Sequence, residues 1–334
     1  MNERNVVVMD GNVNHDWVGM FKGKTLRDGS TIRVVQGSWM ETAITYYSEV
    51  RQTRSTSGED SKLYKKFDCN LLMAPMNESQ GKVKRPSTLV VQPDFVIARN
   101  QVRSLSRESD KRSVLYGLMC SGVPAINSLH SIYMNLERPV VYAALAEIER
   151  RVGHEAFPLI SFNYYSGYKQ MMISPDFPAV LKVSHAHRGM GKMKLDNQQQ
   201  FHDISTIVAL DDQYSTIEPF IDSVYGIRVQ KIGGNYAVYR KDFTGSGWKS
   251  QFGGSSLKEI PLEDKYKLWA DECSKLFGGL DILAVDALHG KDGKDYIIEL
   301  NDTAIGLTPG YWELQTKLIV DIAIERMNDI YCDK

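Results

Sequence analysis

Cysteine is scarce in this sequence, and long apolar runs are absent. The four cysteines stand far apart, at positions 69, 120, 273 and 332, with no Cys-x-x-Cys spacing and no histidine partners nearby. This pattern argues against a disulfide framework or a zinc site and predicts reduced, mostly packed thiols. Runs such as residues 140–146 are too short to cross a bilayer. The N-terminus runs straight into a strand-like segment and lacks the layout of a signal peptide.

An excess of charge of one sign is also missing. The chain has 40 Lys and Arg residues against 41 Asp and Glu residues. Proteins that bind nucleic acid through bulk electrostatics carry a surplus of positive charge, so the composition gives no support for that class. With 334 residues, the chain is too long for one ordinary core. We therefore expect two or three lobes.

Strand and helix signals alternate in the first third of the chain. Apolar segments typical of strands occur at residues 6–9, 31–36, 88–98 (interrupted by Pro93) and 123–127. Asp110 is placed to cap a helix that Gly122 ends. This alternation predicts a small α/β domain with a mainly parallel sheet. A polar stretch at residues 51–62 predicts a mobile loop.

Antiparallel strands and hairpins dominate from about residue 157 onward. Gly233-Gly234 separates two strand-like segments and is a strong hairpin signal. Apolar periodicity and capping residues predict helices at residues 128–137, 138–152, 261–277 and 312–330, the second of them opened by Pro139 and closed by Gly153. Asp196 or Asn197 is placed to cap a further helix that runs through Val208.

An acidic hairpin carries the most informative side chains. Asp286 ends the apolar run 279–286, a turn follows at 290–293, and a second apolar run delivers Glu299 and Asn301. Because side chains alternate along a strand, Glu299 and Asn301 share one side, and Asp286 can join them from the partner strand. Two carboxylates and an amide predict a site for a hard divalent cation. The alternative, a pair of solvated charges, is disfavoured because the neighbours are strongly apolar.

A glycine-containing loop follows the strand that holds Lys182. Gly189 and Gly191 allow open backbone geometry, and Lys192 follows them directly. Backbone amides and two lysines predict a phosphate site. The spacing matches neither a Walker loop nor a Rossmann fingerprint. By itself it fits a plain surface hairpin equally well.

The segment 216–221 is a candidate wall for a flat base. Glu218, or a backbone carbonyl near it, is placed to accept a hydrogen bond from an adenine amino group, and the backbone of Ile221 to donate to a ring nitrogen, with Phe220 between them. An ordinary strand explains the segment equally well when it is taken alone. The case rests on the order of parts: lysine strand, glycine loop, acidic hinge, Arg228 strand and acidic hairpin.

That order is the ATP-grasp layout, and the chain resembles the synapsin family over nearly its whole length. The strings that carry the resemblance are His185-Ala-His-Arg-Gly-Met-Gly-Lys192, Glu218-Pro-Phe-Ile-Asp222, Arg228-Val-Gln-Lys-Ile-Gly233, Phe277-Gly-Gly-Leu-Asp-Ile282 and Ala287-Leu-His-Gly-Lys-Asp-Gly293. Phe21-Lys-Gly-Lys24, Pro93-Asp-Phe-Val96 and Asn127-Ser-Leu-His-Ser-Ile-Tyr133 extend it toward the N-terminus.

The resemblance implies a fold class of α/β (α+β). A small parallel-sheet pre-ATP-grasp domain would occupy residues 1–125, and a two-lobed ATP-grasp domain residues 126–334, with a lobe boundary near 225. The implied ATP-binding residues are Arg138, Lys182, Gly189, Gly191, Lys192, Glu218, Phe220, Ile221 and Lys249. The implied ligands of a Ca²⁺ or Mg²⁺ ion are Asp286, Glu299 and Asn301.

Four features depart from vertebrate relatives and suggest an invertebrate member. The stretch between about residues 51 and 76 is longer than in those relatives. Arg138 replaces a lysine, which keeps the charge and changes the geometry. Asp286 stands where those relatives have Glu or another residue, so calcium dependence does not carry over. Asn301 restores the Glu-x-Asn pattern of catalytic ATP-grasp ligases. Family segments that flank this domain are missing from the sequence, so we expect a domain or a short form.

The resemblance favours a regulatory role. The family coats synaptic vesicles, binds actin and controls neurotransmitter release, which implies a cytoplasmic protein, peripheral on vesicles of presynaptic terminals, that forms dimers or tetramers. The alternative is an active ligase that forms an acyl phosphate on a carboxylate, with Arg228 and Asn301 as candidate catalytic residues. No acceptor-binding signature is visible.

A weaker hypothesis concerns a basic stripe. Arg99, Arg103, Arg107 and Lys111 recur every four residues and could face acidic lipid or actin. Solvated loop charges are the favoured alternative, because acidic residues lie among them.

Overall fold

A computed structural model describes residues 2–12, 14–52, 63–73, 89–103, 110–186, 190–210, 213–243, 255–308 and 310–332. The chain forms two compact units. The first comprises Met1–Tyr133 with Thr303–Lys334, and the second comprises Met134–Asp302. The C-terminal segment therefore belongs to the same unit as the N-terminal one. The expected boundary between the pre-ATP-grasp and ATP-grasp domains at residue 125, and the expected lobe boundary near residue 225, stay predictions.

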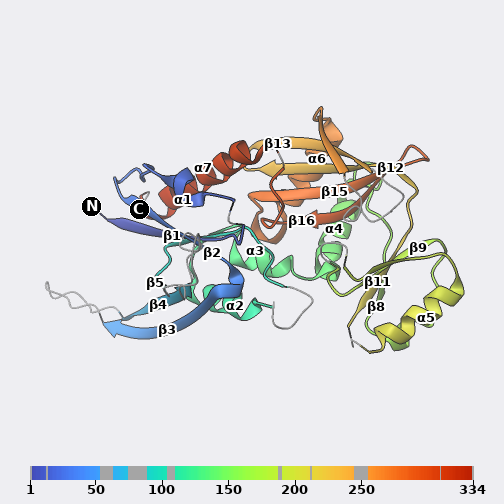
Figure 1. The fold of residues 1–334 in the computed structure, drawn as a ribbon, viewed down its shortest axis with the longest axis horizontal. Helices are drawn as coiled ribbons and strands as arrows, with labels where there is room; N and C mark the ends of the chain where they lie inside the picture. The colour runs from blue at the N-terminus through green and yellow to red at the C-terminus, as the bar shows by residue number, and fades with distance from the viewer. Residues whose placement is uncertain are drawn as a thin grey trace, which may run out of the picture. The chain divides into compact units, whose positions relative to one another are not determined.

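A four-stranded parallel sheet forms the centre of the first unit (Figure 1). Its strands, in the order β2-β1-β6-β7, are β1 (Glu3–Met9), β2 (Thr31–Gly37), β6 (Phe95–Ala98) and β7 (Ala125–Ile126). Consecutive residues from Val6 to Met9 are fully buried, although neighbours in a strand point to opposite faces. Both faces of β1 are therefore covered, as is usual for a parallel sheet. The parallel α/β arrangement predicted from the sequence is confirmed.

The helices of the first unit are α1 (Trp17–Phe21), α2 (Arg112–Ser121), α3 (Leu129–Met134) and α7 (Trp312–Tyr331), with a 3₁₀ turn at Trp39–Glu41. Helix α2 ends at Gly122, whose φ of 67° lies in the left-handed region that glycine tolerates. Within the described residues, no helix combines the length and the apolar character that crossing a bilayer requires.

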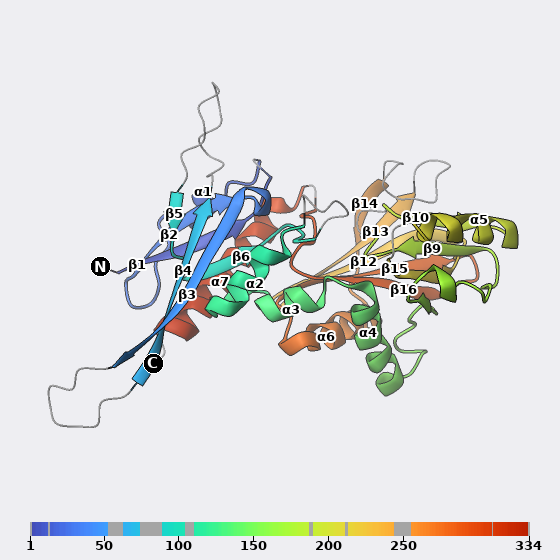
Figure 2. The same cartoon turned by 90° about the horizontal axis from the view of Figure 1, so that it is seen from below.

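A three-stranded antiparallel sheet also belongs to the first unit (Figure 2). It contains β3 (Thr42–Gln52), β4 (Leu63–Met73) and β5 (Leu89–Val91). The sequence suggested one interrupted strand over residues 88–98, but β5 joins this sheet while β6 joins the parallel one. Pro93 lies between them, where its missing N–H removes no ladder hydrogen bond. The loop predicted at residues 51–62 lies outside the described residues from position 53 onward.

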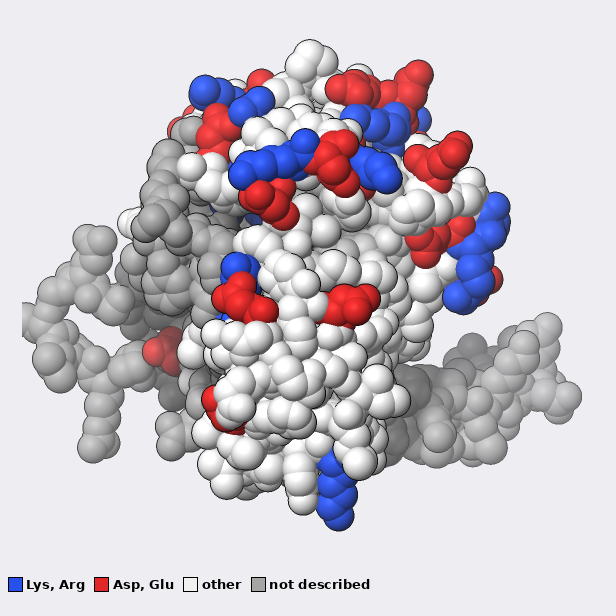
Figure 3. Space-filling model, turned by 90° about the vertical axis from the view of Figure 1, so that its right-hand side faces the viewer, with Lys and Arg blue, Asp and Glu red and all other residues white. Residues whose placement is uncertain are grey.

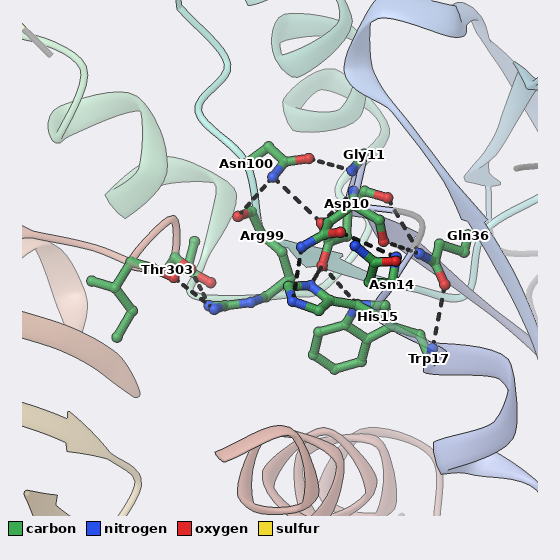
Figure 4. Close-up of polar contacts among 11 residues, drawn as sticks. Asp10, Gly11, Asn14, His15, Trp17, Gln36, Arg99, Asn100 and Thr303 are labelled. Atoms are coloured by element: carbon green, nitrogen blue, oxygen red, sulfur yellow. Dashed lines mark hydrogen bonds and ion pairs between the residues drawn. The ribbon is translucent and has the colours of Figure 1, made fainter. Parts of the chain in front are cut away.

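A polar network occupies the edge of the parallel sheet where β1 and β6 end (Figure 4). The carboxylate of Asp10 is 2% exposed, accepts a hydrogen bond from Trp17 Nε1 at 2.8 Å and pairs with His15 Nδ1 at 2.8 Å. The amide of Gly11 donates to the side chain of Asn100, which follows β6. A buried carboxylate is costly unless donors satisfy it, so this network fixes the loop after β1.

Arg99 cannot belong to the exposed basic stripe that the sequence suggested, because it is buried. This side chain is 5% exposed and donates to the carbonyl oxygens of Thr303 and, at 2.8 Å, Ile305. A guanidinium held inside its own unit does not face lipid or a partner. Arg107 lies outside the described residues.

The second unit contains a small antiparallel sheet with the strand order β10-β9-β11-β8. Its strands are β8 (Asn163–Tyr165), β9 (Ala179–Val183), β10 (Lys192–Leu195) and β11 (Ser215–Pro219). Helix α5 (Gln198–Val208) packs Phe201 and Val208 into the same apolar cluster as Leu181 and Ile217. In Figure 3, which looks onto the end of the molecule where α5 lies, charged side chains gather in the upper half and the lower half is mostly uncharged.

A five-stranded antiparallel sheet, in the order β14-β13-β12-β15-β16, completes the second unit. Its strands are β12 (Ser223–Ile232), β13 (Asn235–Phe243), β14 (Ser255–Ile260), β15 (Ile282–Gly290) and β16 (Asp295–Asn301). Val229, Val238 and Val285 point from one face into a core that also contains residues of α4 (Arg138–Val152) and α6 (Asp264–Ser274). The opposite face carries the polar side chains described next.

Candidate functional site

The acidic hairpin predicted from the sequence exists, and it brings the three expected side chains together. Asp286 of β15 stands directly opposite Glu299 of β16, beside a β-bulge at Asp286 and Ala287. Asn301 Nδ2 donates to Asp286 Oδ2 at 2.9 Å. Bulges commonly re-aim side chains near functional sites. The hairpin therefore presents two carboxylates and one amide oxygen to the same side.

Arg228 neutralises Asp286. It lies on β12 directly opposite Asp286 and donates to both carboxylate oxygens, through Nε at 2.8 Å and Nη2 at 2.9 Å. This two-pronged geometry is the strong form of an arginine–carboxylate pair. The attraction of Asp286 raises the pKa of Arg228 despite its burial.

Arg138 joins the hairpin to the small sheet of the same unit. It is the first residue of α4, and its side chain is 9% exposed. Its Nη2 donates to Glu218 Oε1 at 2.9 Å, and its Nη1 lies 3.6 Å from Glu299 Oε1. Burial opposes the charge of Arg138, but Glu218 and Glu299 outweigh it and raise the pKa.

Lys182 and Glu218 form a buried ion pair between β9 and β11. Their side chains are 5% and 4% exposed, and Lys182 Nζ donates to Glu218 Oε2. Burial, reinforced by the nearby Arg138 charge, lowers the pKa of Lys182 to about 7. Burial opposes ionisation of Glu218, but Lys182 and Arg138 outweigh it and hold the pKa of Glu218 below its usual value.

Both oxygens of Glu218 are thus engaged by cations. Its predicted hydrogen bond to an adenine amino group stays a prediction. Phe220 follows β11, and its ring lies 4.5 Å from Lys194 Nζ. Ile221 is the next residue along this hinge.

The phosphate loop is described in part. Gly191 has a φ of 69°, and a Cβ there would lie 3.1 Å from the carbonyl oxygen of Val183, so glycine is needed at this turn. Lys192 of β10 stands directly opposite Lys182 of β9, and binding of phosphate by the two lysines stays a prediction. Gly189 and Lys249 lie outside the described residues.

Sequence reasoning missed Lys241 of β13. It stands opposite Gly226 of β12, on the same face as Arg228, because Arg228 lies two residues from Gly226. The signal was available. The Gly233-Gly234 turn pairs Ile232 with Asn235. Counting outward along both strands from that pair places Lys241 two residues beyond the partner of Arg228, on the same face of the sheet.

The chain shares most of its length with a known family. The family model described as "Synapsin, ATP binding domain" matches residues 127–329. The synapsin of Drosophila melanogaster is 35% identical over 322 residues. That match covers 95% of this chain but only 29% of the fly protein.

Solved structures with the same fold include a synthetase, a ligase and a RimK domain protein. D-alanyl-alanine synthetase A from Vibrio cholerae has a TM-score of 0.59 at 10% identity over 98% of each chain. The VanG D-Ala:D-Ser ligase from Enterococcus faecalis has a TM-score of 0.57 at 13% identity over 98% of each chain. A RimK domain ATP-grasp protein from Sphaerobacter thermophilus has a TM-score of 0.54 at 13% identity, over 96% of this chain and 99% of the other. Such low identities show the fold alone.

The predicted α/β (α+β) ATP-grasp fold is therefore confirmed, and the insect relative agrees with the expected invertebrate affinity. The family model covers more than half of the chain, and the fly protein matches nearly all of it. This chain belongs to the synapsin family.

Proposed function

We propose that the second unit binds ATP together with a divalent cation. The observation that carries the proposal is the continuous chain of contacts from Lys182 through Glu218 and Arg138 to Glu299. Cations suited to phosphates and carboxylates suited to a metal thereby meet on one unit. The proposed ATP-binding residues are those expected from the sequence, Gly189 and Lys249 included.

The donor set fits a cation that arrives with a nucleotide. Asp286 and Glu299 supply carboxylates, and Asn301 keeps its amide oxygen free for a metal because its Nδ2 is the atom bonded to Asp286. In the described part of the chain, no three His, Cys, Asp or Glu side chains form a metal cluster. Mg²⁺ is commonly held by one or two carboxylates with phosphates and water completing the shell, and Ca²⁺ accepts similar oxygen ligands.

The biological role follows from the family. We propose a cytoplasmic protein that associates peripherally with synaptic vesicles and actin and regulates neurotransmitter release, with nucleotide binding ordering loops such as that of Lys249 and shifting a dimer–tetramer equilibrium. A ligand shifts such an equilibrium only by binding one state better than the other. The division at residue 125 would separate an assembly module from the nucleotide-binding module.

An enzymatic role is the alternative, and Asn301 favours it. A ligase of this fold would transfer the terminal phosphoryl group of ATP to a carboxylate, giving an acyl phosphate and ADP, and an amine or thiol would then displace the phosphate. Asn301 would help hold the metal, and Arg228 would stabilise the charge that develops. ADP release that continues only with an added carboxylate acceptor would support this role.

Calorimetry on the wild type and Asp286→Ala tests the proposed site. In the wild type, Mg²⁺ or Ca²⁺ should strengthen ATP binding at least about tenfold over chelator, which corresponds to about 1.4 kcal/mol. In Asp286→Ala that metal effect should disappear, because one of the two carboxylates is gone. The cation with the larger effect identifies the physiological partner.

Asp203→Ala is the matched control, since Asp203 is an exposed carboxylate on α5 and belongs to the same unit. It should keep the full metal effect. ATP binding that is equally tight with and without metal in the wild type would contradict the proposed cation site, and no ATP binding under any condition would contradict the whole proposal.

A further inference from the structure

We infer that Lys241 binds the terminal phosphate of the nucleotide and selects triphosphates over shorter nucleotides. The inference rests on the proposed ATP site and adds a specificity-determining residue to it. Three observations carry it: the face of the sheet on which Lys241 lies, the lack of a hydrogen bond or ion pair from its ammonium group to the described residues, and its place relative to the metal ligands.

The strand register puts Lys241 on the polar face of the large sheet. Residues that stand opposite each other in an antiparallel pair point to the same side. Lys241 is opposite Gly226, and Arg228, two residues on, is opposite both Tyr239 and Asp286. Val238 and Val229 point the other way, into the core. Lys241 is therefore a diagonal neighbour of the Arg228–Asp286 pair.

Gly226 keeps the space beside Lys241 open. A Cβ at Gly226 would lie 3.4 Å from the Cβ of Lys241 and 3.4 Å from a ring atom of Phe243. Any longer side chain would compete with the lysine for the same room. Glycine at this strand position is otherwise unfavourable, and it commonly marks a place that a ligand approaches closely.

Lys241 carries a charge that the described protein does not neutralise. Arg138, Lys182 and Arg228 each pair with a carboxylate. The ammonium groups of Lys192 and Lys241, in contrast, donate no hydrogen bond and form no ion pair to any described residue. Half-burial lowers the pKa of Lys241; the nearby Asp286 carboxylate opposes this shift, and the charges of Arg228 and Lys192 add to it.

Lys192 on β10 and Lys241 on β13 belong to different sheets, and they lie near enough for Lys192 to act electrostatically on Lys241. Placing like charges close together costs free energy unless an anion lies between them. A polyphosphate chain is such an anion, and lysine binds it as a point charge.

The metal ligands tell which phosphate Lys241 meets. Lys182 adjoins Glu218 at the hinge proposed for the base, and Arg138 reaches from Glu218 to Glu299. Lys241 instead adjoins the Arg228–Asp286 pair, next to Glu299. In nucleotide sites the cation bridges the terminal phosphates. Lys241 therefore lies at the terminal-phosphate end.

Calorimetry with AMP, ADP and ATP in Mg²⁺ tests the inference on the wild type, Lys241→Met and Lys241→Arg. Loss of one charged hydrogen bond should weaken ATP binding about 10- to 100-fold in Lys241→Met. AMP binding should be unchanged, because its phosphate lies at the other end, and Lys241→Arg should retain most of the affinity for ATP.

Lys258→Met is the matched control, because Lys258 is an exposed lysine on the neighbouring strand and stands opposite Arg240, on the other face. It should bind all three nucleotides like the wild type. Equal losses for AMP, ADP and ATP in Lys241→Met, or no loss for ATP, would overturn the inference while leaving the proposed ATP site intact. A wild type that binds no nucleotide would remove both.

Discussion

The position of Arg138 in the sequence suggests an exposed side chain, but the side chain is buried in the structure. Arg138 opens a helix, where a long cationic side chain usually reaches water, yet only 9% of the side chain is exposed. Glu218 and Glu299 offset the cost of that burial from two different sheets. Because arginine forms two directed contacts at once, it serves as a link that lysine would make less rigidly.

The low pKa of Lys182 makes nucleotide binding depend on pH. In the free protein its pKa is about 7, with Glu218, Arg138, Lys192 and Glu299 as the charged groups around it. At about pH 8 most of the lysine is therefore neutral, and a bound phosphate would draw a proton onto it. We expect ATP binding at that pH to take up roughly one proton and to weaken as the pH rises further.

Calorimetric enthalpies in buffers of different ionisation enthalpy measure this proton uptake directly. Lys182→Arg provides the control, because arginine remains charged throughout the range and should abolish most of the buffer dependence. Enthalpies that do not vary among buffers in the wild type would contradict the expected titration of Lys182.

At the scale of elements, local signals predicted helices and hairpins well. Pro139 lies in the first turn of α4 and Gly153 follows its last residue, as expected. The Gly233-Gly234 turn joins β12 to β13. The segment at residues 88–98 was the main error, because its two halves pair with different sheets. A strand's partner is set by long-range contacts, which no local pattern contains.

The cap of α5 gives a test at this scale. The sequence left Asp196 and Asn197 as alternative caps, and the structure selects Asn197, whose side chain accepts from the amide of Gln200 at 3.0 Å. Asn197→Ala should lower the free energy of unfolding by about 1 kcal/mol. Asn197→Ser keeps an oxygen that can accept this hydrogen bond, so it should lower the free energy of unfolding much less.

Chemical denaturation of the three proteins, with the midpoint and the slope compared, measures this difference. If Asn197→Ala unfolds like the wild type, the cap contributes nothing to stability and the helix depends on its packing through Phe201 and Val208.

At the scale of the whole molecule, ligand binding and stability should be coupled. A ligand that binds only the folded state, supplied at about 100 times its dissociation constant, adds about 2.7 kcal/mol to the free energy of unfolding. ATP with Mg²⁺ should therefore raise the melting temperature by several degrees, increasingly with concentration. Asp286→Ala should show a smaller rise than Asp203→Ala at the same ATP concentration.

Differential scanning calorimetry with and without ATP provides the measurement, and Mg²⁺ alone is the reference. A melting temperature that does not change with ATP concentration would argue that the nucleotide does not bind the native state at these concentrations.

The sequence alone determined most of the helices, the Gly233-Gly234 and acidic hairpins, and the family, but it did not predict β3 and β4. These features are local, because they depend on residue type, short spacing and periodicity. Only the tertiary structure decided that Arg138 joins Glu218 to Glu299, that α7 returns to the N-terminal unit, and that Lys241 lies on the same face of the sheet as Arg228. Such contacts join residues far apart in the chain, so they depend on how the sheets and helices pack.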